Sequence, residues 1–225
     1  METAENEQRE PILIFIHGGG FTHGGRREPL IADDVVYRGL GYFGARELGY
    51  TTVVMDYRLL QHGASFDSGG EDLDLVIKWI ESSLCGSDDN DDNARDLVII
   101  GNSAGGVHLM SWPFDDAFTA TRSRLMHAGA HLRLKTAVIL SATMLLDPTI
   151  SAMQDSLLRY FGDEQRVILN SPLNLMNLAA VCGNDGGPVV GGVPLTSWPP
   201  LLFHHNRVRP SICGRHGSKI RKGMG

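Results

Sequence analysis

The segment Leu97-Val-Ile-Ile-Gly101-Asn-Ser103-Ala-Gly105-Gly106 carries the strongest structural signal in the chain. Its first four residues are apolar and mostly β-branched, which is typical of a strand that is covered on both faces. A helical pattern follows at Val107–Trp112. The pattern Gly-x-Ser-x-Gly between a strand and a helix predicts a sharp turn that raises the Ser103 hydroxyl above the edge of a sheet. Glycine suits positions 101 and 105 because such a turn crowds the backbone on both sides of the serine.

Similar strand patterns occur before and after this segment, with helical patterns between them. The strand-like runs are Ile12–Ile16, Thr51–Met55 and Thr136–Leu140. Amphipathic patterns predict one helix that is capped by Asp33 or Asp34 and runs to Leu48, and another at residues 71–80. Strands that alternate with helices imply right-handed crossovers and parallel pairing. We therefore predict the α/β class with a doubly wound, mainly parallel sheet, and we allow for missing edge strands.

The pattern becomes less regular after Leu140. Helices are expected at residues 151–161 and 172–182, a loop at 183–199, and one more strand at 200–203. Charge divides the chain at a similar place. Residues 1–185 hold all 26 acidic and 14 basic residues, whereas residues 186–225 hold six basic residues and no acidic one. We therefore predict a core domain at 11–185 and a divergent, basic, Gly/Pro-rich and irregular tail at 186–225.

The overall composition disfavours several classes of protein. The 225 residues carry a formal net charge of −6, and the lack of a basic excess argues against a nucleic-acid binder. The longest apolar runs are too short to span a bilayer, and the acidic start of the chain lacks the pattern of a secretory signal. Three widely spaced cysteines predict neither a disulfide framework nor a zinc site. We expect a cytoplasmic protein without a metal or cofactor, and the oligomeric state stays open.

A second glycine-rich motif, Ile16-His17-Gly18-Gly19-Gly20-Phe21, follows the first predicted strand. Three consecutive glycines allow a tight turn and leave backbone amides uncovered by side chains. Such amides suit a developing oxyanion or a phosphate. The phosphate alternative is disfavoured because no lysine lies near either glycine cluster, as a phosphate-binding loop would require. The acidic run at residues 87–93 departs from a calcium-binding EF-hand loop, so we interpret it as a solvated loop.

Together, the two motifs resemble those of the α/β-hydrolase superfamily, and within it the carboxylesterases of the hormone-sensitive-lipase type. The matching pieces are His17–Gly20, Val54–Leu59 and Gly101–Gly106. The resemblance covers about residues 11–185 and implies an α/β-hydrolase fold that is incomplete at both ends. By position, it makes Ser103 the nucleophile and assigns the oxyanion hole to the amides of Gly19, Gly20 and Ala104. It also implies structural roles for Asp56 and Arg58 at the end of the second strand.

The other members of a catalytic triad are harder to place. A serine nucleophile needs a histidine base and a carboxylate that orients the base, and in this superfamily they follow in the order serine, acid, histidine. The resemblance implies an acid after Phe203, where the chain reads His204-His205-Asn206-Arg207. We take Asp147 as the candidate acid, with a loop or helix cap as its alternative role. We take His216 as the candidate base, followed by His204 and His205, and a surface histidine is the alternative for each.

Two classes of function stay open. The first is a serine hydrolase of the carboxylesterase/lipase type that cleaves small carboxylic esters through an acyl-enzyme on Ser103. The second is a catalytically impaired α/β-hydrolase-like protein that binds a small ligand. A usable Asp–His pair would discriminate between them. The inversion of charge near the end also motivates a hypothesis of truncation or misassembly, in which residues after about 204 are out of register with the chain's relatives.

Overall fold

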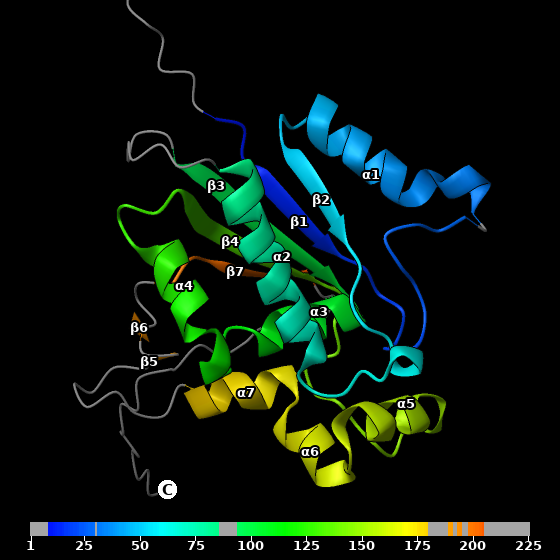
Figure 1. Cartoon of the computed structure of the whole chain (residues 1–225). Helices are drawn as coiled ribbons and strands as arrows, with labels where there is room; N and C mark the ends of the chain where they lie inside the picture. Colours follow the sequence, from blue (N-terminus) through cyan, green and yellow to red (C-terminus); the bar gives the residue numbers. More distant parts are fainter. Residues whose placement is uncertain are drawn as a thin grey trace, which may run out of the picture.

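A computed structural model describes residues 9–29, 31–85, 94–179, 189–190, 193–194 and 198–204. Within these ranges, five strands form a parallel sheet in the order β2-β1-β3-β4-β7 (Figure 1). The strands are β1 (Ile12–Ile16), β2 (Thr51–Met55), β3 (Arg95–Asn102), β4 (Leu132–Leu140) and β7 (Leu201–His204). The predicted parallel sheet is confirmed, and β7 lies within one residue of the predicted last strand.

Helices connect the strands and follow most of the predicted positions. They are α1 (Val35–Arg46), α2 (Ser68–Leu84), α3 (Ala104–Ser111), α4 (Thr119–Met126), α5 (Ser151–Phe161), α6 (Glu164–Leu169) and α7 (Pro172–Ala179). We did not predict α4 or α6. Within the stretch that we predicted as loop, β5 (Val189–Val190) and β6 (Val193–Pro194) form a short antiparallel ladder.

The sheet has helices on both faces. Ile14 of β1 joins the core cluster that contains Leu73 and Ile77 of α2. The next residue, Phe15, contacts Tyr37 of α1, with ring centroids 5.8 Å apart. Because successive residues of a strand point to opposite faces, α1 and α2 lie on opposite faces of the sheet. The doubly wound arrangement is therefore confirmed.

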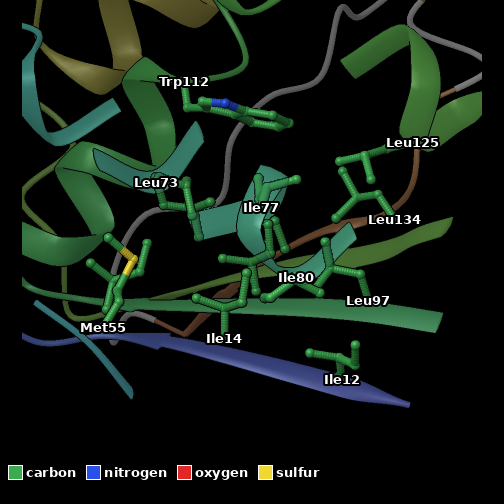
Figure 2. Close-up of a cluster of buried hydrophobic side chains, with 14 of the residues drawn as sticks. Ile12, Ile14, Met55, Leu73, Ile77, Ile80, Leu97, Trp112, Leu125 and Leu134 are labelled. Carbon is green, nitrogen blue, oxygen red and sulfur yellow. The ribbon is translucent and has the colours of Figure 1, made fainter. Parts of the chain in front are cut away.

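The main core lies between the sheet and the face that α2, α3 and α4 cover. Figure 2 shows apolar side chains from the sheet that meet those of α2 and the segments after it. The labelled members of this cluster are Ile12, Ile14, Met55, Leu73, Ile77, Ile80, Leu97, Trp112, Leu125 and Leu134. Each fully buried isoleucine or leucine contributes about 1.5–3 kcal/mol relative to an exposed one. This face therefore supplies most of the apolar packing beneath the carboxyl edge of the sheet.

The opposite face is less deeply buried in the part of the chain that the structure describes. Along β3, Leu97 and Ile99 are fully buried on the α2 face, whereas the alternating Val98 and Ile100 are only half-buried. The sequence pattern predicted strands covered on both faces, and the structure adds that the coverage is unequal in the described residues. The physical reason is that α1 packs mainly on β2 at the edge of the sheet.

The start of α1 also differs from the sequence prediction. Asp34 has a positive φ of 69° and its side chain makes no capping hydrogen bond to the helix. Its buried carboxylate instead accepts hydrogen bonds from Nε of Arg27 at 2.8 Å and from the backbone N–H of Glu28 at 2.6 Å. These two donors lower the pKa of Asp34. Asp34 thus stabilises the loop that enters the helix, through charge-assisted hydrogen bonds to Arg27 and Glu28.

Candidate active site

Ser103 lies at the turn between β3 and α3, at the carboxyl edge of the sheet. Its backbone has φ 51° and ψ −118°, a conformation that non-glycine residues rarely adopt and that costs about 1–3 kcal/mol. Hydrogen bonds on both sides hold it there. The N–H of Ser103 donates to the Leu140 carbonyl at 2.8 Å, and its own carbonyl accepts from the Gly106 N–H at 2.9 Å. The side chain of Ser103 is exposed, so the turn presents its hydroxyl to solvent.

The glycines around Ser103 are required by close backbone packing. A Cβ on Gly101 would lie 2.5 Å from the carbonyl oxygen of Gly105. A Cβ on Gly105 would lie 2.3 Å from the carbonyl oxygen of Ile16, at the end of β1. Both distances are far below van der Waals contact. The Gly-x-Ser-x-Gly pattern therefore exists because the start of α3 packs directly against two neighbouring strands.

The glycine-rich loop after β1 lies beside this turn. A Cβ on Gly18 would lie 3.1 Å from Cβ of Ser103, so the two segments touch. Gly19 and Gly20 both have positive φ, of 135° and 58°. The carbonyl of Gly19 accepts hydrogen bonds from the amides of Thr22 and His23 at 3.1 and 3.0 Å, which closes the turn. Two motifs separated by about 80 residues of sequence thus meet at one edge of the sheet.

Three backbone amides in this region have free hydrogens. Among the described residues, no backbone or side-chain acceptor pairs with the N–H groups of Gly19, Gly20 or Ala104. Ala104 is the first residue of α3, where the positive end of the helix dipole adds to the field of its amide. Unpaired amides beside an exposed hydroxyl form an arrangement that stabilises negative charge on an oxygen atom.

The buried side chain of His17 hydrogen-bonds to the backbone of the glycine-rich loop. The ring is fully buried, and its Nδ1 lies 2.7 Å from the Gly18 carbonyl oxygen. Because a carbonyl only accepts, Nδ1 carries the proton, and Nε2 is the bare nitrogen. Burial lowers the pKa of His17, which keeps the ring neutral. The ring also stacks on Tyr57 with centroids 4.2 Å apart.

His108 on α3 lies in a buried polar cluster rather than at the surface. Its Nδ1 lies 3.3 Å from the hydroxyl of Tyr160, which also accepts a hydrogen bond from the Gly69 N–H. His108 Nε2 has no hydrogen-bond partner among the described residues. Complete burial lowers the pKa of His108 to about 3. A histidine of this kind does not serve as a base for Ser103 at neutral pH.

Sequence reasoning did not identify Asp67, which lies at the start of α2 beside this cluster. Its Oδ1 accepts hydrogen bonds from the Ser111 hydroxyl at 2.6 Å and from the Gly70 N–H at 3.1 Å. Burial raises the pKa of Asp67 to about 7. Its contact with Ser111 joins residues 44 positions apart, so no local sequence pattern indicated it.

The residues after β2 have structural partners. The guanidinium of Arg58 pairs with Asp72 and Glu71 of α2 at 2.9 and 2.6 Å. Asp56 accepts a hydrogen bond from the Arg26 N–H at 2.5 Å and pairs with the Arg26 side chain at 3.3 Å. These contacts tie the end of β2 to α2 and to the loop after the glycine-rich motif. This agrees with the structural roles that the resemblance implied.

The candidate acid and bases are not brought to Ser103 within the described residues. Asp147 is exposed, and its Oδ1 accepts hydrogen bonds from the N–H and hydroxyl of Thr149 at 2.8 and 2.7 Å. This is the turn-capping role that the sequence left open. His204 is exposed at the end of β7, and no described side chain hydrogen-bonds to the Ser103 hydroxyl. His205, His216 and the acidic run at 87–93 lie outside the described residues.

In the described ranges, no group of three or more His, Cys, Asp or Glu side chains is arranged to hold a metal ion. No helix in those ranges is both long enough and apolar enough to cross a bilayer.

Comparison with solved structures identifies the fold. Esterase B from Lactobacillus rhamnosis, inhibited by a C6-C4 SN3 compound, matches with a TM-score of 0.55 and 18% identity over 90% of this chain. The hyperthermophilic esterase from Pyrobaculum calidifontis matches with a TM-score of 0.53 and 21% identity over 87% of this chain. The match spans 57% of each of those two proteins. A lipase/esterase from Lactobacillus plantarum matches with a TM-score of 0.53 and 17% identity, over 91% of this chain and 80% of its own.

The parallel sheet, the serine turn and these neighbours define an α/β-hydrolase fold. The family model BD-FAE matches residues 1–113, a range that contains both glycine-rich motifs. The chain belongs to the BD-FAE family. A search of curated proteins found no match.

Proposed function

We propose that this protein is a serine hydrolase of the carboxylesterase/lipase type that cleaves small carboxylic esters. The observation that carries the proposal is the exposed Ser103 hydroxyl at a strained strand–helix turn, beside three amides with free hydrogens. The strained backbone of Ser103 has no evident structural benefit of its own. Membership of the BD-FAE family supports the same reading.

The proposed reaction forms an acyl-enzyme. Oγ of Ser103 attacks the ester carbonyl while a histidine base takes its proton, and the amides of Gly19, Gly20 and Ala104 stabilise the oxyanion. The base then protonates the departing alcohol. A water molecule then attacks the acyl-enzyme by the same steps, which releases the carboxylic acid and restores the Ser103 hydroxyl. We assign the base to His216, ahead of His204 and His205, and the orienting carboxylate to Asp147.

In this proposal, the two segments of the chain supply different parts of the active site. The core at residues 11–185 supplies Ser103 and the amides, and the basic segment at 186–225 supplies the base. Leu201–His204 of that second segment joins the sheet as β7, so the fold continues to at least His204. A small ester is the proposed partner.

Labelling with a fluorophosphonate probe tests the proposal. An activated serine displaces fluoride and forms an Oγ–phosphorus bond, so we expect one adduct, mapped by peptide mass spectrometry to Ser103. Heat-denatured protein and the Ser103→Ala variant should remain unlabelled. Ser141→Ala is the matched control, because Ser141 is also exposed, has φ 51° and lies at the end of the neighbouring strand β4.

One observation favours the alternative function of a ligand-binding, catalytically impaired protein. No described side chain hydrogen-bonds to Ser103 Oγ, and a serine without a base loses several powers of ten in rate. Folded wild-type protein that forms no adduct at Ser103 would support this alternative and would overturn the esterase proposal.

A further inference from the structure

The carbonyl groups of His17 and Gly18 accept hydrogen bonds from buried side chains. The Tyr57 hydroxyl donates to the His17 carbonyl oxygen at 3.1 Å and is 3.4 Å from the Gly18 carbonyl oxygen. Nδ1 of His17 donates to the same Gly18 oxygen at 2.7 Å. Two buried side chains therefore converge on the peptide that joins Gly18 to Gly19.

Because the peptide bond is planar, the contacts to the Gly18 carbonyl also fix the direction of the Gly19 N–H. In a trans peptide, the carbonyl of Gly18 and the N–H of Gly19 point in opposite directions. Donors that hold the carbonyl inward thus turn the Gly19 N–H outward, and this N–H is one of the three with free hydrogens. Gly18 itself touches Ser103, so this peptide lies beside the proposed nucleophile.

Tyr57 is held in place to act as a donor. Its side chain is 5% exposed, and its ring lies between two histidines, stacked on His17 and edge-on to His108 with centroids 4.4 Å apart. Burial raises the pKa of Tyr57, so the hydroxyl keeps its proton at neutral pH. Gly24 leaves room for the arrangement, because a Cβ there would lie 2.6 Å from the Gly18 oxygen.

We propose that Tyr57 is a positioning residue that, together with His17, holds the Gly18–Gly19 peptide so that the Gly19 N–H points to the oxyanion of an ester at Ser103. The inference rests on the proposed function for its catalytic meaning, whereas the orientation of the peptide is independent of it. Tyr57 does not touch the substrate and acts through the backbone.

The first test measures the peptide itself in Tyr57→Phe, which removes only the hydroxyl. In protein labelled with ¹³C and ¹⁵N, the carbonyl resonances of His17 and Gly18 and the amide resonance of Gly19 should shift, since the loss of a hydrogen bond changes their shielding. Tyr37→Phe is the matched control. The Tyr37 ring also lies near His17, with centroids 6.4 Å apart, but its hydroxyl makes no hydrogen bond to the loop. Tyr37→Phe should leave these resonances in place.

The second test measures the reaction. The rate constant for labelling of Ser103 by the fluorophosphonate should fall about tenfold or more in Tyr57→Phe, a smaller loss than the removal of an oxyanion donor. With a small ester substrate, kcat should fall while KM and the pH dependence of the rate stay unchanged, because the base and the ester-binding surface are intact. A merely structural role would lower the thermal midpoint without this separation of kcat from KM.

The outcomes distinguish the two proposals. Unchanged resonances in Tyr57→Phe would overturn the role of Tyr57, and so would a normal labelling rate in a variant whose wild type reacts. If the wild type does not label at Ser103, the esterase proposal fails. Shifted resonances would then still support the orientation of the peptide by Tyr57.

Discussion

Ser103 shows how a single residue depends on its glycine neighbours. Its strained backbone is retained because hydrogen bonds from β4 and α3 fix both sides of the residue. Gly105 allows α3 to start within contact of β1, and no larger residue fits there. The exposure of the hydroxyl thus follows from backbone packing rather than from the serine side chain.

Gly105→Ala adds only one methyl group, but it should destabilise the protein strongly. The new Cβ would lie 2.3 and 2.5 Å from two backbone carbonyl oxygens, those of Ile16 and His17, which are fixed in the sheet edge. We expect a loss of about 3 kcal/mol in the free energy of unfolding, measured by urea denaturation.

Gly39→Ala is the control for this prediction. Gly39 lies inside α1, and a Cβ there would meet nothing within 4 Å. Alanine should raise the free energy of unfolding by about 0.5–1 kcal/mol, because glycine loses more backbone entropy in a helix. Equal effects of the two substitutions would contradict the account of the turn.

At the scale of elements, α2 and α3 bury two titratable groups with opposite pKa shifts. His108 of α3 has a folded pKa of about 3 against a usual value of 6.5, so only the unfolded chain takes up its proton between these values. Asp67 before α2 has a folded pKa of about 7 against 3.8, so only the folded protein holds its proton between those values. Acid thus weakens the fold through His108 and strengthens it through Asp67, and the two effects offset each other between about pH 4 and 6.5.

In Asp67→Asn, the pH dependence of stability that comes from His108 should no longer be offset by Asp67. The amide keeps an acceptor for Ser111 and cannot titrate. Relative to wild type, the free energy of unfolding of the variant should fall by about 1.4 kcal/mol for each pH unit from 6.5 down to 4. Asp155→Asn on α5 is the control, because its carboxylate is 85% exposed and makes only a long ion pair with Arg159. Parallel pH profiles of wild type and Asp67→Asn would refute the shift.

At the scale of the molecule, one half of the proposed site is ordered by the sheet. Parallel strands bring the ends of β1 and β3 together, so the serine turn and the glycine-rich loop meet without any contribution from the tail. The base has no such placement, since the sheet as described ends at His204. The proposed triad therefore depends on residues that are distant in sequence from Ser103.

A histidine scan tests the assignment of the base. His216→Gln should lower the labelling rate of Ser103 by about a thousandfold or more, because loss of a triad base removes most of the activation of the serine. His204→Gln should leave it near the wild-type rate. The reverse result would assign the base to His204, and full labelling of both variants would remove His216 from the proposed site.

The sequence by itself determined the class of fold and the central chemical motif. Short apolar strands alternate with amphipathic helices, and Gly101, Gly105 and the glycines at 18–20 mark where the backbone must turn or pack closely. These are local signals, because strand pattern, turn residues and helix starts depend on neighbours in the chain.

Only the tertiary structure decided which side chains support the site. Tyr57 contacts the glycine-rich loop from 40 residues away, and Tyr160 contacts His108 from 52 residues away. Asp34 turned from an expected helix cap into the partner of Arg27, and half-buried Ile100 showed that the two faces of the sheet differ. Such contacts join residues that are distant in sequence, and their burial depends on how helices pack on a completed sheet, so no local pattern records them.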